Sequence, residues 1–355
     1  MKDKTFSLAD WKIRSRAPLR LGLAGGGTDV SPYSDDFGGA VLNATIDRYA
    51  FAFAESSPSG QICFVASDLK TEECFPLDLA ALNASKLPLH VAVYLRMIKD
   101  FGGGRPLPIT VRTMVDAPPG SGLGSSSALV VALVEAFRAL LDVPLGPYEV
   151  AHLAYEIERI DLRLSGGKQD QYAAAFGGLN YIEFMANDRV IVNPLRVSRP
   201  ILNELETSLI VCFTGISRRS EQIIDQQRSG MTAKTARTLD SLHQLKSDAL
   251  EMKQALLRAD ITHMARVLEH SWIAKKETAS GVSTSAIEAL HDAAMGAGAL
   301  AGKVSGAGGG GFMMFIAPPE HRLRLLNVLN EAGGIAAGIK FSERGAESWR
   351  WPARE

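Results

Sequence analysis

One short segment constrains this chain more than any other: a glycine-rich loop that runs directly into helix-forming residues. Residues 116–128 read Asp-Ala-Pro-Pro-Gly-Ser-Gly-Leu-Gly-Ser-Ser-Ser-Ala, and residues 125–141 predict a helix. The first N–H groups of a helix lack intrahelical partners and carry the positive end of the helix dipole. Glycines before them let a polyphosphate lie against the backbone, and serine hydroxyls can bind phosphate oxygens or Mg²⁺. A serine N-cap after a flexible loop is the alternative, but these glycines and serines exceed what a cap requires.

Two other kinds of nucleotide-binding loop are excluded by the sequence. No GxxxxGK[ST] segment, typical of P-loop proteins, occurs in the chain. Residues 306–311 match GxGxxG formally, but they precede a strand predicted over residues 312–316. A dinucleotide-binding fold needs this loop after a strand and before a helix, so we reject that interpretation.

The composition is that of an ordinary globular protein. The chain has 355 residues, which favours two units. Its 38 basic and 39 acidic side chains give a net charge of −1, so nothing indicates nucleic-acid or membrane-surface binding. The longest apolar run, residues 128–134, is far shorter than the roughly 20 residues of a membrane helix. Residues 1–10 lack the apolar core of a signal peptide, and we expect a cytoplasmic protein.

The three cysteines, Cys63, Cys74 and Cys212, are odd in number and have no metal-ligand spacing. We expect free thiols in a reducing compartment, with a Cys63–Cys74 disulfide as the alternative. The seven histidines include no HExxH or similar pair, so no structural metal is expected.

The hydrophobic pattern predicts an α+β protein with two lobes. Strands are predicted over residues 50–55, 61–66, 107–114, 312–316 and 338–342. Helices are predicted over residues 125–141, 148–161, 235–258, 260–276, 285–297 and 320–332. Pro194 and Pro200 bracket a short mixed stretch, so we place a boundary there and expect units of residues 1–198 and 199–355.

Two more segments carry candidate chemistry. Residues 20–29 read Arg-Leu-Gly-Leu-Ala-Gly-Gly-Gly-Thr-Asp, and their charged and hydroxylated ends suit contacts with sugar hydroxyls. A surface loop is the alternative for this segment. Asp170 follows two glycines, a lysine and a glutamine in residues 166–171, where it is either a reactive acid or a turn residue.

Taken together, three motifs resemble those of the GHMP family of small-molecule kinases, which includes galacto-, homoserine, mevalonate and phosphomevalonate kinases. Residues 17–29 resemble the first family motif, and residues 118–128 match the second, PxxxGLGSS[AS], in full. Residues 303–311 are similar to the third. The motifs follow the family's order over residues 17–311, and the second is highly specific.

This resemblance implies a two-lobe GHMP kinase fold, with an N-terminal ATP-binding lobe similar to ribosomal protein S5 domain 2 and a ferredoxin-like C-terminal lobe. It also implies that ATP and Mg²⁺ are used to phosphorylate a substrate hydroxyl. Positioning and charge neutralisation carry most of such a reaction. Asp170 matches the family's catalytic aspartate, which would orient the hydroxyl and accept its proton, and Arg20 would keep Asp170 ionised.

The resemblance also assigns the other site residues. Glu158, 12 residues before Asp170, would hold Mg²⁺ together with Ser126 or Ser127, and Glu156 is the competing acid. The implied ATP-binding residues are Pro119, Gly120, Ser121, Gly122, Leu123, Gly124, Ser125, Ser126 and Ser127. The implied sugar-binding residues are Gly26, Gly27, Thr28, Asp29, Gly167, Gln169, Gly308 and Gly309.

The substrate is a finer question. Galactokinases read GEHTD in the first motif, whereas residues 25–29 read Gly-Gly-Gly-Thr-Asp, which argues against galactose. Residues 25–47 and 166–178 look most like those of bacterial kinases that phosphorylate D-glycero-D-manno-heptose 7-phosphate at its anomeric hydroxyl, in nucleotide-heptose synthesis for surface polysaccharide. A fucokinase-like sugar 1-kinase and, in another class, a non-catalytic sugar sensor are the alternatives.

A substrate that already carries a phosphate also needs cationic side chains. Arg218, Arg219 and Lys276 are the candidates from the second lobe, because a guanidinium can bind phosphate in bidentate fashion and an ammonium can bind it as a point charge. Exposed basic residues near a helix start are the alternative. The apolar content of the second-lobe helices would also allow a homodimer.

Overall fold

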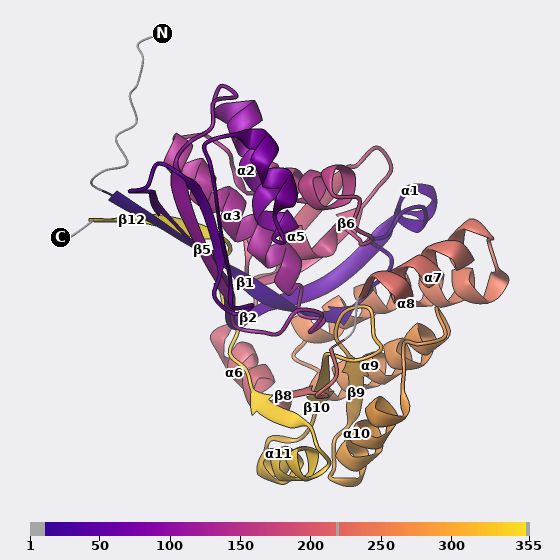
Figure 1. Ribbon diagram of the computed structural model, residues 1–355. Coiled ribbons are helices and arrows are strands. Elements are labelled where there is room, and N and C mark those ends of the chain that lie inside the picture. The colour runs from indigo at the N-terminus through magenta and orange to yellow at the C-terminus, as the bar shows by residue number, and fades with distance from the viewer. Residues whose placement is uncertain (1–10, 218–219, 353–355) are drawn as a thin grey trace.

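The computed structural model describes residues 11–217 and 220–352, which form two sheets with helices around them (Figure 1). Within this part of the chain, the larger sheet has eight strands in the order β12 (Glu347–Pro352), β1 (Trp11–Ala24), β2 (Gly39–Ser56), β5 (Ile109–Val115), β3 (Ile62–Ala66) and β4 (Thr71–Phe75), while β6 (Leu179–Phe184) pairs with β2 and with β7 (Val190–Pro194). The smaller sheet runs in the order β11 (Ile335–Gly338), β8 (Leu209–Phe213), β10 (Phe312–Ile316) and β9 (Ala301–Val304).

Strand β1 carries a buried side chain on each of its faces near its end. Ile13, Leu19 and Leu21 alternate along the strand and are buried in the core, since successive side chains point to opposite faces. The register against β2 shifts between Pro18 and Arg20, as in a β-bulge that re-aims a side chain next to a site. Arg20 lies on the face opposite Leu19 and is buried as well.

Helix α3 (Ser125–Leu141) packs on β1 and β2 and is the central helix of this part of the molecule. Most of its residues are buried, as expected for a helix that is apolar on nearly every side. It contacts α2 (Pro88–Phe101), α4 (Pro147–Glu156) and α5 (Gln169–Phe176). Helix α4 continues into a π-helical turn, η3 (Ile157–Asp161), a feature often found at functional sites.

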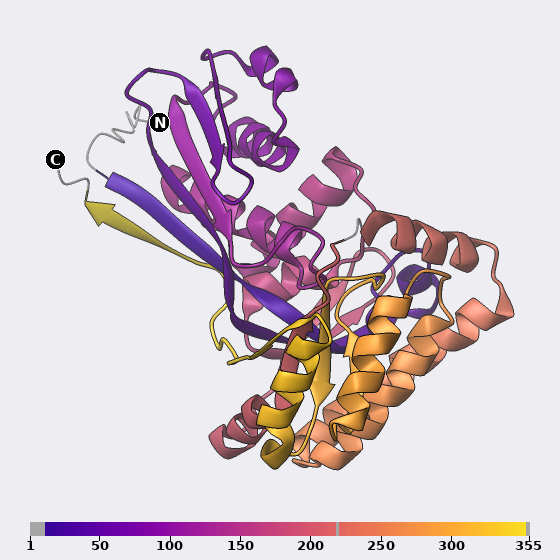
Figure 2. The same cartoon turned by 60° about the horizontal axis from the view of Figure 1, so that its bottom comes forward.

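The helices of the second half are α6 (Arg199–Ser208), α7 (Ser220–Thr232), α8 (Ala236–Leu257), α9 (Ile261–Lys276), α10 (Ser285–Gly296) and α11 (Arg322–Glu331) (Figure 2). Helices α6, α9, α10 and α11 contact the smaller sheet, whereas α8 packs on β1 and β2 of the larger sheet and α7 packs on α8. Short helices α1 (Tyr33–Phe37), η2 (Leu79–Ala84) and η4 (Pro319–His321) complete the described elements. No helix in residues 11–217 or 220–352 is both long and apolar enough to span a membrane.

One of the hydrophobic core clusters contains residues of both sheets, and a second cluster lies on the smaller sheet. The first cluster includes Leu19 and Val131 from the first half, and Met252, Leu268 and Met314 from the second half. Strand β12 also returns to pair antiparallel with β1, so the last strand joins the larger sheet. The boundary after residue 198 stays a prediction, and the end of the predicted second unit contributes to the sheet of the first.

Most predicted elements are confirmed to within a few residues. The helix predicted over residues 125–141 is α3, and the helix predicted over residues 148–161 is α4 with its π-helical turn. The strand predicted over residues 338–342 is wrong, because β11 ends at Gly338. The chain then leaves the smaller sheet and makes a single bridge from Phe341 to Ile46.

The expectation of three free thiols is wrong for two of them. Strands β3 and β4 pair antiparallel with Cys63 opposite Cys74, and a disulfide joins their side chains. This register brings the two sulfur atoms together, since directly opposed residues of adjacent strands have neighbouring Cβ atoms. Cys212 is free, and burial raises the pKa of its thiol to about 11.

Candidate active site

A cavity of about 480 Å³ lies where the end of β1, the start of α3, the loop before α5, and helices α7 and α9 meet. Its volume is in the range of small-molecule sites. The predicted site residues that line it are Arg20, Gly27, Asp29, Pro119, Gly120, Gly122, Gly124, Ser125, Ser126, Ser127, Glu158, Gly167, Gln169 and Asp170. The fold thus brings together candidates that are far apart in the sequence.

The loop before α3 has the backbone conformation that its glycines predict. Gly120, Gly122 and Gly124 have φ angles of 71°, 76° and 73°, in the left-handed region that favours glycine. A Cβ at Gly122 would also collide with the carbonyl oxygen of Ser305. The loop and the first turn of α3 line one wall of the cavity, so a helix N-terminus suited to an anion lies at this wall.

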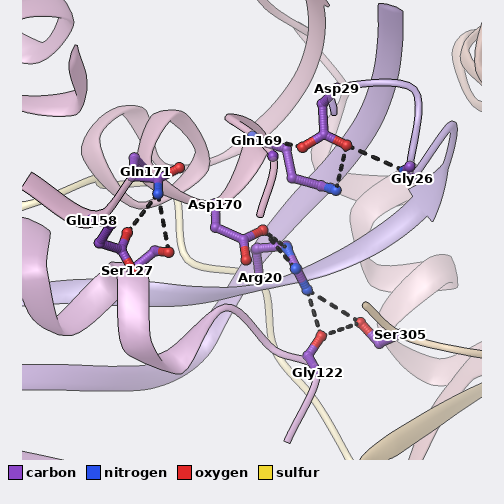
Figure 3. Close-up of polar contacts among 12 residues, drawn as sticks. Arg20, Gly26, Asp29, Gly122, Ser127, Glu158, Gln169, Asp170, Gln171 and Ser305 are labelled. Atoms are coloured by element: carbon purple, nitrogen blue, oxygen red, sulfur yellow. Dashed lines mark hydrogen bonds and ion pairs between the residues drawn. The ribbon is translucent and has the colours of Figure 1, made fainter. Parts of the chain in front are cut away.

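Arg20 and Asp170, which both line the cavity, form an ion pair (Figure 3). The Nε and Nη2 atoms of Arg20 lie 2.7 Å and 2.5 Å from Oδ1 of Asp170. Nη1 of Arg20 donates to the carbonyl oxygen of Gly122 at 2.5 Å, which ties the pair to the glycine loop. Both contacts with Asp170 use the same oxygen. The other oxygen, Oδ2, faces Gly124, where a Cβ would lie 3.3 Å from it.

Glu158, on the π-helical turn, is buried and shares a partner with Ser127. Nε2 of Gln171 lies 2.5 Å from Oε2 of Glu158 and 3.2 Å from Oγ of Ser127, and Ser126 lies 3.4 Å from Oε1. Mg²⁺ prefers such carboxylate and hydroxyl oxygens and usually adds water and substrate phosphate oxygens. These residues therefore fit a magnesium ion shared with a bound nucleotide.

The competing acid, Glu156, has other partners. Its Oε2 lies 2.6 Å from Nη2 of Arg96, and its Oε1 lies 3.6 Å from Nε2 of His152. Glu156 does not line the cavity, whereas Glu158 does. The geometry therefore favours Glu158 as the acid next to the glycine loop.

Asp29 and Gln169 lie on another side of Asp170. Oδ2 of Asp29 accepts the backbone N–H of Gln169 at 3.0 Å, while Oδ1 accepts Nε2 of Gln169 at 3.1 Å and the N–H of Gly27 at 3.2 Å. Burial raises the pKa of Asp29, although the backbone N–H donors oppose the shift. A Cβ at Gly167 would collide with this carboxylate, so only glycine fits there. The carboxylate and amide groups suit sugar hydroxyls.

Some predicted residues do not line the cavity. Thr28 is fully buried, and its Oγ1 donates to the carbonyl oxygen of Gly25 at 2.8 Å and accepts the N–H of Ala40 at 3.0 Å. This side chain therefore holds the loop instead of a sugar, which corrects the prediction. The other predicted residues outside the cavity lining are Ser121, Leu123, Gly26, Gly308 and Gly309. The last two pack against Val282.

Lys276, which the sequence predicts as a phosphate-binding residue, lies outside the cavity lining. Nζ of Lys276 lies 3.5 Å from Oε1 of Glu288 and 5.3 Å from the centre of the Trp272 ring, outside the cavity lining. The preceding residue, Lys275, is buried and lines the cavity. Successive helix residues point roughly 100° apart, so the two lysines face different surroundings. The structure therefore places Lys275, and not Lys276, at the cavity.

The predictions for Arg218 and Arg219 fall outside the described residues. Sequence reasoning missed Arg159, which lines the cavity and donates from Nε to the carbonyl oxygen of Gly167 at 3.3 Å. Its place directly after the candidate metal acid was an available signal. The contribution of α7 was also missed, because its cavity-lining residues, such as Glu221, belong to no motif.

Comparisons with known proteins agree with this arrangement. The family model described as GHMP kinases N terminal domain matches residues 88–178, and the model described as GHMP kinases C terminal matches residues 252–335. The chain is 43% identical to the D-glycero-alpha-D-manno-heptose 7-phosphate kinase of Campylobacter jejuni, over 95% of this chain and 99% of that protein. It is 27% identical to the L-fucokinase/L-fucose-1-P guanylyltransferase of Bacteroides fragilis, over 91% of this chain and 36% of that protein.

Solved structures have the same two-sheet α+β fold, which confirms the predicted fold class. A D-glycero-D-manno-heptose 1-phosphate kinase from Bacteroides thetaiotaomicron aligns with a TM-score of 0.81 and 44% identity, over 95% of this chain and 98% of that one. The Lactococcus lactis galactokinase complexed with galactose aligns with a TM-score of 0.74 and 17% identity, over 95% of each chain, which shows the fold alone. The matched regions and the full-length identity lead to one conclusion: this chain belongs to the GHMP kinase family.

Proposed function

We propose that this protein transfers the γ-phosphoryl group of ATP to the anomeric hydroxyl of D-glycero-D-manno-heptose 7-phosphate, which gives the 1,7-bisphosphate and ADP. The 43% identity to the Campylobacter jejuni heptose 7-phosphate kinase, over nearly the whole of both chains, supports this substrate. The Bacteroides relative is named for a heptose 1-phosphate. Both names point to a heptose phosphate and differ in the position of its phosphate, which the experiment below decides.

The orientation of Asp170 is the observation that carries the proposed reaction. Arg20 holds Oδ1 with two nitrogens, and Oδ2 faces Gly124 at the N-terminus of α3. A sugar hydroxyl bound at Oδ2 would lie next to the place where a helix N-terminus favours phosphate. Oδ2 orients this hydroxyl and accepts its proton. The oxygen of the sugar hydroxyl bonds to the γ-phosphorus, and the bond between the γ-phosphorus and the oxygen that bridges it to ADP breaks.

The site has a phosphate side and a sugar side. In Figure 3, Ser127 and Glu158 lie on one side of Asp170, and Asp29 and Gln169 lie on the other. The ATP phosphates would lie along the glycine loop and the start of α3, on the side of Ser127. The sugar ring would then extend from Asp170 toward Asp29, whose carboxylate lines the cavity.

Ser127 and Glu158 would hold Mg²⁺ together with phosphate oxygens of ATP, and the ion would neutralise negative charge on the transferred group. Gln171 contacts both side chains and keeps the hydroxyl and the carboxylate close together. The product would supply nucleotide-activated heptose for a surface polysaccharide, in the cytoplasm, where ATP is available. A homodimer stays a prediction that size-exclusion chromatography tests.

The experiment is ADP release from ATP and Mg²⁺ with a panel of sugars. The panel holds heptose 7-phosphate, heptose 1-phosphate, unphosphorylated heptose, L-fucose and galactose, and a reaction without sugar is the blank. We expect the highest kcat/KM for heptose 7-phosphate. A preference for heptose 1-phosphate would move the acceptor hydroxyl to another carbon, and a preference for L-fucose would favour the fucokinase alternative. Binding of a sugar without ADP release would favour the sensor.

A further inference from the structure

The side chain of Lys275 combines burial with unused donors. The residue is 3% exposed and lines the cavity. In the described ranges, its Nζ has one hydrogen-bond partner, the carbonyl oxygen of Gly26 at 3.3 Å, and no ion-pair partner. A lysine ammonium carries three N–H donors, and a buried charge is costly unless it is paired. These unused donors at a cavity wall indicate that a ligand completes the site.

Two glycines leave room for that ligand. A Cβ at Gly26 would lie 3.9 Å from Nζ of Lys275 and 3.8 Å from Nε2 of Gln169, so both donors surround the place where a side chain is missing. Gly27, the next residue, lines the cavity as well. Nε2 of Gln169 has two hydrogens and uses one for Asp29 at 3.1 Å. An ammonium and an amide donor therefore both lie within 4 Å of the position that a side chain at Gly26 would take, next to the cavity that Gly27, Gln169 and Lys275 line.

The other cations of the cavity wall are engaged elsewhere. Arg20 holds Asp170 and the glycine loop. Arg159 donates to the carbonyl oxygen of Gly167 and lies 3.7 Å from Oε1 of Glu158, on the side proposed for Mg²⁺. Among the described cavity-lining cations, Lys275 is thus the one whose charged group lies beside Gly26 and Gln169, whereas Arg159 lies beside Gly167. The carboxylate of Asp29 accepts three N–H donors and makes no hydrogen bond with Lys275, although its negative charge partly offsets the lowering of the Lys275 pKa by burial.

We infer that Lys275 binds the phosphate that the sugar substrate already carries and so selects a sugar phosphate over the free sugar. This inference rests on the proposed function. An ammonium that donates to a phosphate oxygen makes a charge-assisted hydrogen bond, which is stronger than a bond between neutral groups. The acceptor hydroxyl lies at Asp170, and the phosphate lies beyond Asp29 at Lys275 and Gly26.

The test compares two neighbouring lysines. Lys275→Met removes the buried charge and keeps the length of the side chain, and Lys276→Met makes the same change outside the cavity. Lys275→Arg restores the charge. Each variant is assayed for KM and kcat with heptose 7-phosphate and with unphosphorylated heptose, and for KM of ATP. Calorimetric titration with heptose 7-phosphate in the absence of ATP measures binding without turnover, and thermal melting confirms folding.

We expect Lys275→Met to raise KM for heptose 7-phosphate about 10- to 100-fold, the effect of losing one charged hydrogen bond. KM for the free sugar and for ATP should change less than about twofold, and Lys275→Arg should recover part of the loss. An equal loss with both sugars would overturn the inference, since it would show a structural role. A loss confined to Lys276→Met would also overturn it and restore the prediction from sequence.

Failure of the proposed function gives a different pattern. If the wild type binds heptose 7-phosphate but releases no ADP, the proposed reaction falls, and the calorimetric comparison of the variants still decides the role of Lys275. If the wild type phosphorylates heptose 7-phosphate and Lys275→Met keeps its preference over the free sugar, only the inference about Lys275 falls. If the wild type binds no sugar phosphate at all, both are overturned.

Discussion

Lys275 and Lys303 are both buried, and their charges repel each other. Nζ of Lys303 lies 3.4 Å from the carbonyl oxygen of Leu23. Burial lowers the pKa of Lys275 to about 8 and that of Lys303 to about 7. The positive charges of Lys275 and Arg20 lower the pKa of Lys303 further, while Asp248 opposes them. Both ammonium groups therefore reduce the stability of the fold around the site.

The Lys303→Met variant tests this cost through the pH dependence of stability. The pKa of Lys303 is about 7 in the folded protein and about 10.4 in the unfolded chain, so the unfolded chain binds more protons between these values. Stability of the wild type should rise with pH across this window by up to about 1.4 kcal/mol per pH unit from this group. Lys303→Met should be more stable than the wild type at pH 7, with a difference that shrinks toward pH 10. Urea unfolding at several pH values measures it, and two parallel curves would contradict the account.

At the residue scale, chemistry was easier to predict than direction. The resemblance to the GHMP motifs assigned Arg20, Asp170 and Asp29 to a kinase site, and the structure brings all three to the cavity. Thr28 has the same suitable chemistry but points into the protein, where its hydroxyl satisfies buried backbone groups. Lys275 and Lys276 are chemically identical, and only the packing of α9 decides which one faces the cavity. The sequence alone does not show how α9 is rotated against its neighbours, so it could not distinguish the two lysines.

At the scale of elements, the glycine loop and α3 position the reacting carboxylate as well as the phosphate. Gly124 has a φ of 73°, and a Cβ there would lie 3.2 Å from Cγ of Asp170. Gly104, in a surface loop, has nearly the same φ of 71°, with nothing within 4 Å of its Cβ position. The two glycines therefore share a left-handed backbone conformation, in which a residue with a Cβ would be strained, but differ in their contact with Asp170.

Gly124→Ala and Gly104→Ala form a matched pair. Both should lose about 1–2 kcal/mol of stability, because alanine is strained in the left-handed region. Gly124→Ala should also lower kcat at least about 10-fold, since displacing a reacting group by a fraction of an ångström is costly in rate. Steady-state kinetics and urea unfolding of both variants separate the two effects. Equal kcat values for the two variants would mean that the contact with Asp170 does not matter.

Elements with a strong periodic pattern could be predicted from the sequence, whereas features that depend on the pairing of one strand with another could not. The run over residues 125–141 has helix formers throughout and a glycine loop before it, and α3 has these bounds. Strand β1 contains Pro18 and two register shifts, so its sequence has no regular strand pattern, and the pairing with β2 stabilises it. The Cys63–Cys74 disulfide likewise depends on the register of β3 and β4, which follows from tertiary contacts.

At the scale of the whole molecule, residues from the two halves of the chain pack together in more than one place. One hydrophobic core contains residues of both sheets, and β12 returns to β1 after the smaller sheet is complete. Arg16 of β1 and Glu347 of β12 also form an ion pair at 2.5 Å. The account therefore predicts that the two halves unfold together, although two lobes often unfold in separate steps.

Tryptophan fluorescence can test this cooperativity. The chain has four tryptophans, of which Trp272 is buried in α9 while Trp349 and Trp351 lie in β12. A variant with phenylalanine at positions 11, 349 and 351 reports on Trp272, and Trp272→Phe reports on the larger sheet. In urea unfolding, each variant should show a single transition. Within each variant, the midpoint measured by fluorescence should equal the midpoint measured by circular dichroism. Separate midpoints for fluorescence and circular dichroism would show independent halves.

The most direct test of the account follows the transferred phosphoryl group. ³¹P NMR is recorded on ATP, Mg²⁺ and heptose 7-phosphate with the wild type, with Asp170→Asn, and with Asp100→Asn, a change at a carboxylate that pairs with Arg96 away from the cavity. The account predicts a new anomeric phosphate signal as the γ-phosphate of ATP disappears, at a rate that falls about 10²–10⁴-fold in Asp170→Asn and is unchanged in Asp100→Asn. A wild-type rate in Asp170→Asn, or a phosphate on another carbon, would contradict it.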